Sequence, residues 1–234
     1  RASDLDPFQL LADVELAANR IAKAIANEEV IACFSDYDAD GLGANACFRH
    51  VMKHCFGYPS ERTLSFVGDR LKEGYGLTKK AVERILSAQT VPSVVITADC
   101  GSADEARIRT LTQNHVAAII TDHHKIPVQT PESAYAFVNP QRPDCRYPDK
   151  AIAGGMVLWL LMWAVRQEMK RLSIPVADPS ALVSALDFVT CSTVADCVSL
   201  ASVNNRVIVR EGLRQMNESP RPCWRAMGQF IHSE

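Results

Sequence analysis

Three aspartates at alternate positions follow a short apolar run near the start of the chain, and this pattern limits the possible folds. Residues 30–32 (Val-Ile-Ala) predict a buried strand, and Asp36, Asp38 and Asp40 come next, before Gly41. Side chains two residues apart along a strand point to the same side, so we expect these carboxylates to crowd together where the strand ends. Like charges so close repel, and a hard divalent cation would offset them. The alternative is an acidic loop with Asp40 as the N-cap of the next helix.

The same pattern of an apolar run followed by polar side chains recurs along the first half of the chain. Strands predicted at 62–67, 93–97, 116–120 and 135–138 alternate with helices predicted at 41–56, 77–87 and 103–113, the last of these capped by Ser102. Such alternation favours βαβ units and a parallel sheet, in which ligands bind at the carboxyl ends of the strands. The reactive side chains at those predicted ends are Asp38, Asp40, Asp99, Asp122, His123 and His124.

The rest of the chain is predicted to be mainly helical, with helices at 8–27, 152–172, 179–195 and 204–215. Asp196 follows the third of these in a largely apolar neighbourhood, where a buried carboxylate needs a cation or strong donors. The last residues, with Pro220 and Pro222, are expected to form a tether.

Composition excludes some classes of protein. The net charge of −2 rules out binding to nucleic acid by bulk charge, so any such binding needs a local groove. The eight cysteines include no C-x-x-C pair and no spacing typical of zinc sites, which predicts reduced thiols and a cytoplasmic protein. The longest apolar run, 151–165, has 15 residues, short of the roughly 20 that span a bilayer, so we expect no membrane contact.

Residues 68–76 form a polar loop with three glycines, which let a backbone approach a ligand closely. Arg70 and Lys72 offer cationic donors, and Tyr75 offers a ring for stacking. The alternative interpretation is an ordinary solvated loop.

The mixture of carboxylates and imidazoles, without cysteine, suits Mn²⁺ or Mg²⁺ more than structural zinc. The candidates are too many for one ion and fit two ions about 3.5–4 Å apart that share a carboxylate. We predict that Asp99 is the shared ligand, because a central strand lies nearest both ions. In the pair that follows Asp122, one imidazole would bind metal and the other would reach a phosphate oxygen.

Several motifs together resemble the DHH phosphoesterase superfamily, and within it the RecJ-type single-strand-specific 5′→3′ DNA exonucleases. They are Asp38-Ala39-Asp40-Gly41, Asp99-Cys100-Gly101, Asp122-His123-His124, Arg70 to Gly76, Asn139-Pro140, Cys145 to Pro148, Ala153-Gly154-Gly155, and Thr193 to Asp196 followed by Asn205-Arg206. The resemblance implies a three-layer α/β/α domain around a five-stranded, mainly parallel sheet, with a helical C-terminal part. It also implies a hydrolase of DNA repair and recombination with two divalent cations, Mn²⁺ or Mg²⁺, acting on single-stranded DNA. Partners such as single-strand-binding proteins or helicases cannot be read from the sequence.

The resemblance also implies roles for individual residues. The implied metal ligands are Asp36, Asp38, Asp40, Asp99, His123 and Asp196, with Asp36 and Asp122 as ligands or as supports of ligands. The implied catalytic residues are Asp99, Asp122 and His124, and the implied substrate-binding residues are Arg70, Tyr75, His124, Asn139, Gly154 and Gly155. Further candidate contacts to the DNA backbone are Lys72, Lys125, Arg142 and Arg146, and Tyr75 or Tyr147 could stack a base. The motifs depart from the family pattern at Phe34, at 67–70 and at 190–192.

The expected organisation is a catalytic domain at 1–200 that includes the N-terminal helix, followed by a helical extension at 201–234 that leads to a second, substrate-binding domain outside this chain. Two other functions stay open. One is a DHH phosphodiesterase of short oligonucleotides or cyclic dinucleotides. The other is a non-catalytic DHH scaffold module, against which the complete set of candidate ligands argues.

Overall fold

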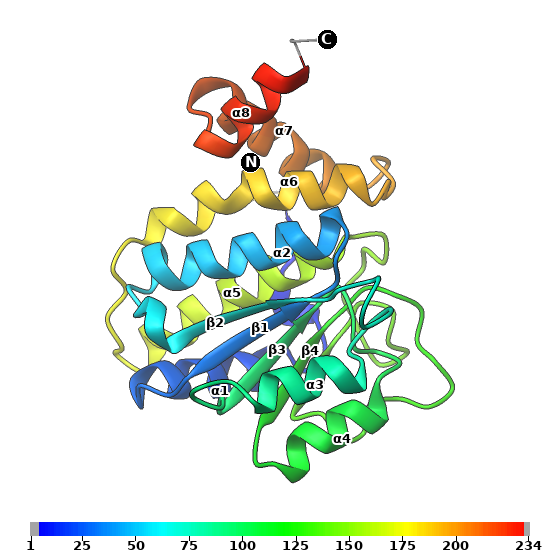
Figure 1. Cartoon of the computed structure of the whole chain (residues 1–234). Helices are drawn as coiled ribbons and strands as arrows, with labels where there is room; N and C mark the ends of the chain where they lie inside the picture. The colour runs from blue at the N-terminus through cyan, green and yellow to red at the C-terminus, as the bar shows by residue number, and fades with distance from the viewer. Residues whose placement is uncertain (1–4, 232–234) are drawn as a thin grey trace.

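A parallel sheet of five strands forms the centre of the computed structural model, which describes residues 5–231 (Figure 1). The strands lie in the order β2-β1-β3-β4-β5. Their bounds are Ile31–Ser35 for β1, Thr63–Val67 for β2, Val94–Ala98 for β3, Ala117–Thr121 for β4 and Ala136–Val138 for β5. Strands β1 and β3 are buried along their whole length, which explains why they read as continuous apolar runs. The predicted parallel sheet is confirmed.

The strand register brings the ends of all five strands to one edge of the sheet. Ala98, the last residue of β3, is level with Ser35 in β1 and with Thr121 in β4. Main-chain hydrogen bonds continue this ladder one residue further, because the amides of Asp36, Asp99 and Asp122 donate to the neighbouring strands at 3.0–3.3 Å. The side chains that follow the strands are therefore held side by side by backbone pairing.

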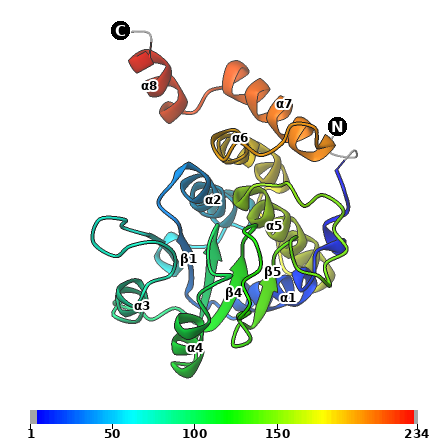
Figure 2. The same cartoon turned by 90° about the vertical axis from the view of Figure 1, so that its right-hand side faces the viewer.

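Helices cover both faces of the sheet, as the three-layer prediction requires (Figures 1 and 2). On one face lie α1 (Val14–Ala26), α2 (Ala39–His50) and α5 (Gly154–Arg171), and on the other lie α3 (Lys79–Leu86) and α4 (Glu105–Gln113). The two cores take alternate residues of the same strand: Ile31 and Cys33 face the first core, whereas Ala32 and Phe34 face the second. Helix α5 is apolar on nearly all sides because it lies between α1, α2 and α6.

The C-terminal part is helical, as predicted, and it stacks outward from the first face (Figure 2). A 3₁₀-helix at Pro179–Ala185 leads into α6 (Leu186–Ala195), which packs on α2. Next come α7 (Val203–Glu218), which packs on α6, and α8 (Pro222–Ile231). The expected tether is therefore wrong for residues 222–231, because Pro222 occupies the first turn of a helix, where a missing N–H does no harm.

Some boundaries differ from the predictions. Helix α1 begins six residues later than expected, since Phe8–Leu10 forms a 3₁₀-turn and Asp13 has a left-handed backbone with φ 59°. The residue before α4 is Asp104, whereas the amide of Ser102 donates to the Asp122 carboxylate, so Ser102 does not cap that helix. Within residues 5–231, no helix is long and apolar enough to cross a membrane.

Candidate metal centre

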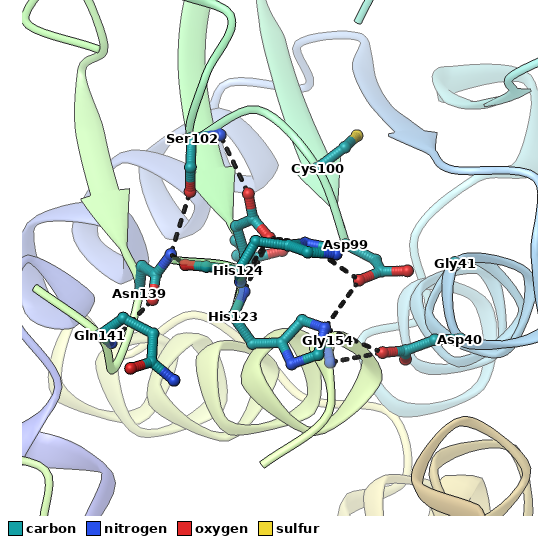
Figure 3. Close-up of polar contacts among 12 residues, drawn as sticks. Asp40, Gly41, Asp99, Cys100, Ser102, His123, His124, Asn139, Gln141 and Gly154 are labelled. Carbon is teal, nitrogen blue, oxygen red and sulfur yellow. Dashed lines mark hydrogen bonds and ion pairs between the residues drawn. The ribbon is translucent and has the colours of Figure 1, made fainter. Parts of the chain in front are cut away.

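The six predicted metal ligands gather at the carboxyl edge of the sheet, and Figure 3 labels Asp40, Asp99 and His123 among them. One group consists of Asp36, Asp38 and Asp99, and a second consists of Asp40, His123 and Asp196; within each group the ligand atoms lie within 4.8 Å of one another. The two groups touch, because Nε2 of His123 lies 3.2 Å from Oδ1 of Asp99. These residues come from the loops after β1, β3 and β4, from the first turn of α2, which carries Asp40, and from the end of α6.

Asp99 lies at the centre of this cluster in an uncommon backbone conformation. Its φ of 61° is left-handed, a region that only a few per cent of residues other than glycine adopt. Gly154 packs directly against it, and a Cβ at Gly154 would lie 2.8 Å from Asp99 Oδ1. Only glycine at 154 leaves space for this carboxylate, so the start of α5 is shaped around Asp99.

Asp40 is held by the N-terminus of α5. Its two carboxylate oxygens accept hydrogen bonds from the amides of Gly154 and Gly155, both at 2.7 Å. These two glycines were predicted to touch substrate, but their amides are already used by Asp40. The open N–H groups and the dipole of a helix N-terminus favour a negative charge at this position. The N-cap of α2 is Asp38, which accepts from the amide of Gly41 at 3.0 Å, and not Asp40.

His123 faces three carboxylates at once. In addition to Asp99, its Nε2 lies 3.6 Å from Asp40 and 3.8 Å from Asp196. The side chain of Asp196 is 28% exposed, so the prediction that it is buried was wrong. The reason is its place at the C-terminal end of α6, where the chain turns outward into residues 197–202.

His124 lies at the edge of this cluster, where it forms a further group of possible metal ligands with Asp99 and His123, and it is fixed by Asp122. Its Nδ1 is 2.8 Å from Asp122 Oδ1, which also accepts from the main-chain amides of His123 and His124. The other oxygen of Asp122 accepts from the amide of Ser102. Asn139 was predicted to contact substrate, but its side chain is buried and donates to Ser102 Oγ and to the carbonyl oxygen of His124. Asn139 therefore holds the His-His segment in place.

The electrostatics differ between the cluster and Asp122. Burial and then the charge of Asp40 raise the pKa of Asp99 to about 8. Burial opposes the charged form of His123, but the carboxylates of Asp99 and Asp40 raise its pKa to about 9. Burial also raises the pKa of Asp40, against the effect of the two glycine amides. For Asp122, hydrogen bonds from His124 and Ser102 outweigh burial and lower the pKa to about 2.

Unsatisfied polar atoms point to a missing positive partner. Among residues 5–231, five buried side-chain atoms have no hydrogen bond, and three of these are Asp36 Oδ1, Asp99 Oδ1 and His123 Nε2. In the same part of the chain, Asp40, Asp99 and Asp196 form ion pairs with imidazoles only, without lysine or arginine. Carboxylate oxygens and imidazole are the donors that Mn²⁺ uses, and carboxylates suit Mg²⁺ as well, so the residues fit such ions.

The predicted DNA contacts divide into exposed and occupied side chains. Arg70, Lys72, Tyr75, Lys125 and Arg146 are exposed. Arg70 lies over the ring of Tyr37 at 5.4 Å. Arg142 is occupied by ion pairs with Asp13 and Asp144, both at 2.6 Å, and Tyr147 is fully buried in the core. Neither of these two can serve as predicted, since an ion-paired guanidinium and a buried ring are closed to DNA.

Two residues that support the site were not predicted. Ser192 on α6 donates to the carbonyl oxygen of Asp40 at 3.1 Å and packs against Gly43 and Gly155. Asp104 accepts from the amide of Leu77 at 3.0 Å and touches Gly76 at the end of the polar loop. Both contacts join segments far apart in the chain, so local sequence patterns do not predict them. The sequence gives one signal for Ser192, namely the small residues Gly43 and Gly155 that pack on it.

Comparison with known proteins agrees with this geometry. Residues 30–185 match the family described as "DHH family, N-terminal domain". The chain belongs to the DHH family. The matched range contains five of the six clustered side chains, and Asp196 lies beyond it.

Curated relatives of this DHH chain include two bacterial proteins described as "Single-stranded-DNA-specific exonuclease RecJ". The protein of Dickeya dadantii is 31% identical over 94% of this chain, and that of Bacillus subtilis is 34% identical over 92%. The matches cover 38% and 25% of those proteins, so the chain spans roughly a third of the relatives' length.

Solved structures give the same result. A crystal structure of exonuclease RecJ bound to manganese matches 89% of this chain and 49% of its own, with 30% identity and a TM-score of 0.73. The Thermus thermophilus RecJ in complex with Mn²⁺ matches 94% of this chain and 30% of its own, with 27% identity and a TM-score of 0.72. The predicted fold and family resemblance are confirmed.

Proposed function

We propose that this DHH domain is the metal-dependent catalytic part of an exonuclease that hydrolyses single-stranded DNA from its 5′ end. The observation that supports this most is the cluster of buried donors whose atoms lack hydrogen-bond partners: Asp36, Asp99 and His123. Buried carboxylates without partners are unfavourable unless a cation binds them. Such a cluster is therefore expected in an enzyme that binds metal ions, whereas a scaffold protein does not need it. The relatives described as RecJ single-stranded-DNA-specific exonucleases support the substrate.

The proposed ligands of two divalent cations, Mn²⁺ or Mg²⁺, form two sets that meet at Asp99. Asp36, Asp38 and Asp99 would hold one ion, and Asp40, His123 and Asp196 would hold the other, with Asp99 between them. Bound there, such ions lower the pKa of a water molecule and offset the negative charge of a phosphoryl group. The protein holds the carboxylates close together before any ion binds. Backbone pairing between the strands and the α5 amides that bind Asp40 keep them in place.

His124 and Arg70 are the proposed contacts to the reacting phosphate. Asp122 binds Nδ1 of His124, so the proposed phosphate contact falls to Nε2, which also lies 3.3 Å from the hydroxyl of Tyr75. The carboxylate of Asp122 stays ionised across the neutral range because its pKa is about 2, so it favours a proton on Nδ1. Arg70 is exposed beside the site and offers a planar, charged fork to phosphate oxygens.

Binding of DNA by this chain alone should be weak. The exposed cations among the predicted DNA contacts are Arg70, Lys72, Lys125 and Arg146, of which Lys72 pairs with Asp69 at 3.2 Å, and the chain as a whole has a net charge of −2. Few phosphates are neutralised, so affinity falls with added salt. We place the catalytic domain at 1–200 and regard 201–234 as an extension toward a second, substrate-binding domain, consistent with the greater length of the relatives.

The test is hydrolysis of single strands labelled at the 5′ or the 3′ end, with Mn²⁺ and with EDTA. We expect metal-dependent release of short products from the 5′ end and little activity on duplexes. Equal activity in EDTA contradicts the metal mechanism. Faster hydrolysis of di- and trinucleotides than of long strands transfers the assignment to a phosphodiesterase of short oligonucleotides, whereas binding of Mn²⁺ without hydrolysis of any of these substrates favours a scaffold.

A further inference from the structure

His124 is held from several sides, and one of its neighbours has no role yet in the proposed reaction. Asp122 binds its Nδ1 and its main-chain amide, and Asn139 binds its carbonyl oxygen. The remaining ring nitrogen, Nε2, lies 3.3 Å from the hydroxyl oxygen of Tyr75. The two rings meet edge to face, with centroids 6.4 Å apart and an interplanar angle of 86°.

We infer that the hydroxyl of Tyr75 is a positioning group for His124, separate from any stacking of its ring on a base. An imidazole with a hydrogen bond at Nδ1 alone can still tilt about that bond. A second contact at Nε2 restricts the tilt, so the Nε2 edge of the ring stays at one position, where the proposed phosphate oxygen would share it with the Tyr75 hydroxyl. Tyr75 then acts through His124, and the inference rests on the proposed hydrolysis in which His124 meets phosphate.

The polar loop is built to keep Tyr75 at this position. Glycines on both sides have left-handed backbones, with φ 92° at Gly74 and 72° at Gly76. At the end of the loop, Asp104 accepts from the amide of Leu77 and lies 3.0 Å from the place where a Cβ on Gly76 would stand. Any larger residue at 76 would strain the backbone and would also crowd this carboxylate. These restraints give Tyr75 a defined direction, which a free solvated loop would not.

The loop is also fastened at its first half. The carbonyl oxygen of Asp69 accepts from the amides of Lys72, Glu73 and Gly74, and Glu73 pairs with Arg84 on α3 at 2.9 Å. Tyr75 is therefore carried by a closed turn that is tied to α3 at one end and to the start of α4 at the other. Its side chain is 60% exposed, so substrate can still reach the ring.

A double-mutant cycle on the 234-residue chain tests the inference. Tyr75→Phe removes the hydroxyl and keeps the ring, so we expect kcat to fall about 3- to 10-fold, the range for one lost hydrogen bond, with KM unchanged. In the His124→Ala background the same substitution should have no further effect, because its target is gone. An equal loss in both backgrounds means that Tyr75 acts on substrate directly and overturns the inference.

Two controls separate this inference from general effects on the fold or the reaction. Tyr135→Phe removes another exposed hydroxyl, at the start of β5 and so at the opposite edge of the sheet, and should leave kcat unchanged.

Nitrogen NMR of the Mg²⁺-loaded chain gives a readout that needs no hydrolysis. There, Tyr75→Phe should move the Nε2 resonance of His124 and leave that of His115 in place. If the His124 resonance does not move, the positioning contact is refuted even when the enzyme is active, and if the chain hydrolyses nothing, a moved resonance still supports it.

Discussion

Two aspartates of this molecule are equally buried and differ in what compensates their charge. The side chain of Asp187, at the start of α6, is 4% exposed, and that of Asp99, after β3, is 2% exposed. Asp187 accepts from Nε of Arg221 at 2.5 Å and from Nε1 of Trp224 at 2.7 Å. Asp99 faces His123, and its Oδ1 makes no hydrogen bond among the described residues.

The contrast distinguishes a structural carboxylate from one kept for a ligand. A buried charge needs a partner, because its loss of hydration is worth several kcal/mol. The partners of Asp187 come from the segment that joins α7 to α8 and from α8 itself, so the pair fastens the C-terminal helix to the body of the domain. The partners of Asp99 within the chain are incomplete, and we propose that a cation completes them. Substitution should therefore harm function at one site and stability at the other.

The largest expected effect is loss of activity in Asp99→Asn. Asparagine tolerates the left-handed backbone at this position and removes only the charge, so the domain should stay folded. A shared ligand holds both proposed ions, and we expect the rate to fall by about 10³-fold or more. Nuclease assays and circular dichroism on the same preparation check this. Retention of a tenth of the wild-type rate would show that Asp99 is not the shared ligand.

His124→Ala should have the next largest effect. The expected loss is about 10²-fold in kcat, typical of one contact in the transition state, with Mn²⁺ affinity unchanged. Calorimetry with Mn²⁺ and steady-state kinetics measure the two quantities. If Mn²⁺ affinity collapses instead, the proposed roles of His123 and His124 must be exchanged.

Asp187→Ala tests the structural carboxylate of the pair and should lower stability without affecting Mn²⁺ binding. It removes the partner of Arg221, whose side chain is 25% exposed, so we expect a loss of about 1–3 kcal/mol in the free energy of unfolding. Mn²⁺ binding should persist. Glu132→Ala, a change at an exposed residue between β4 and β5, is the control and should lie within about 0.5 kcal/mol of wild type. Denaturant unfolding gives the values, and equal stability of the two variants would mean that the Asp187 cluster does not fasten α8.

The smallest expected effect is a dependence on pH. In the metal-free fold Asp99 has a pKa raised from 3.8 to about 8, and His123 has one raised from 6.5 to about 9. Both groups hold protons more tightly folded than unfolded, so stability falls as pH rises through these intervals toward about 9. Mn²⁺ must displace those protons, so its affinity should rise over the same range. Calorimetry in buffers of different ionisation enthalpy measures the released protons, and binding without proton release contradicts the prediction.

Residues close in the sequence were predicted better than the contacts between distant segments. The five strands and the helices between them follow from local patterns, and the structure confirms them. The roles proposed for Asn139, Gly154 and Tyr147 did not fit their contacts. Gly154 donates to Asp40, 114 residues away, and Asn139 donates to Ser102, 37 residues away, whereas Tyr147 is buried in the core.

The sequence by itself determined the parallel sheet and the edge at which the carboxylates meet. Apolar, β-branched runs alternate with helical periodicity, and parallel pairing brings the carboxyl ends of strands together without further information. Only the tertiary structure decided which carboxylates are compensated from within the chain. That depends on whether a distant donor, such as Arg221 for Asp187 or the α5 amides for Asp40, comes within hydrogen-bond distance. Periodicity reports which face of an element is buried, whereas a hydrogen bond requires a position in space, and packing alone sets that position.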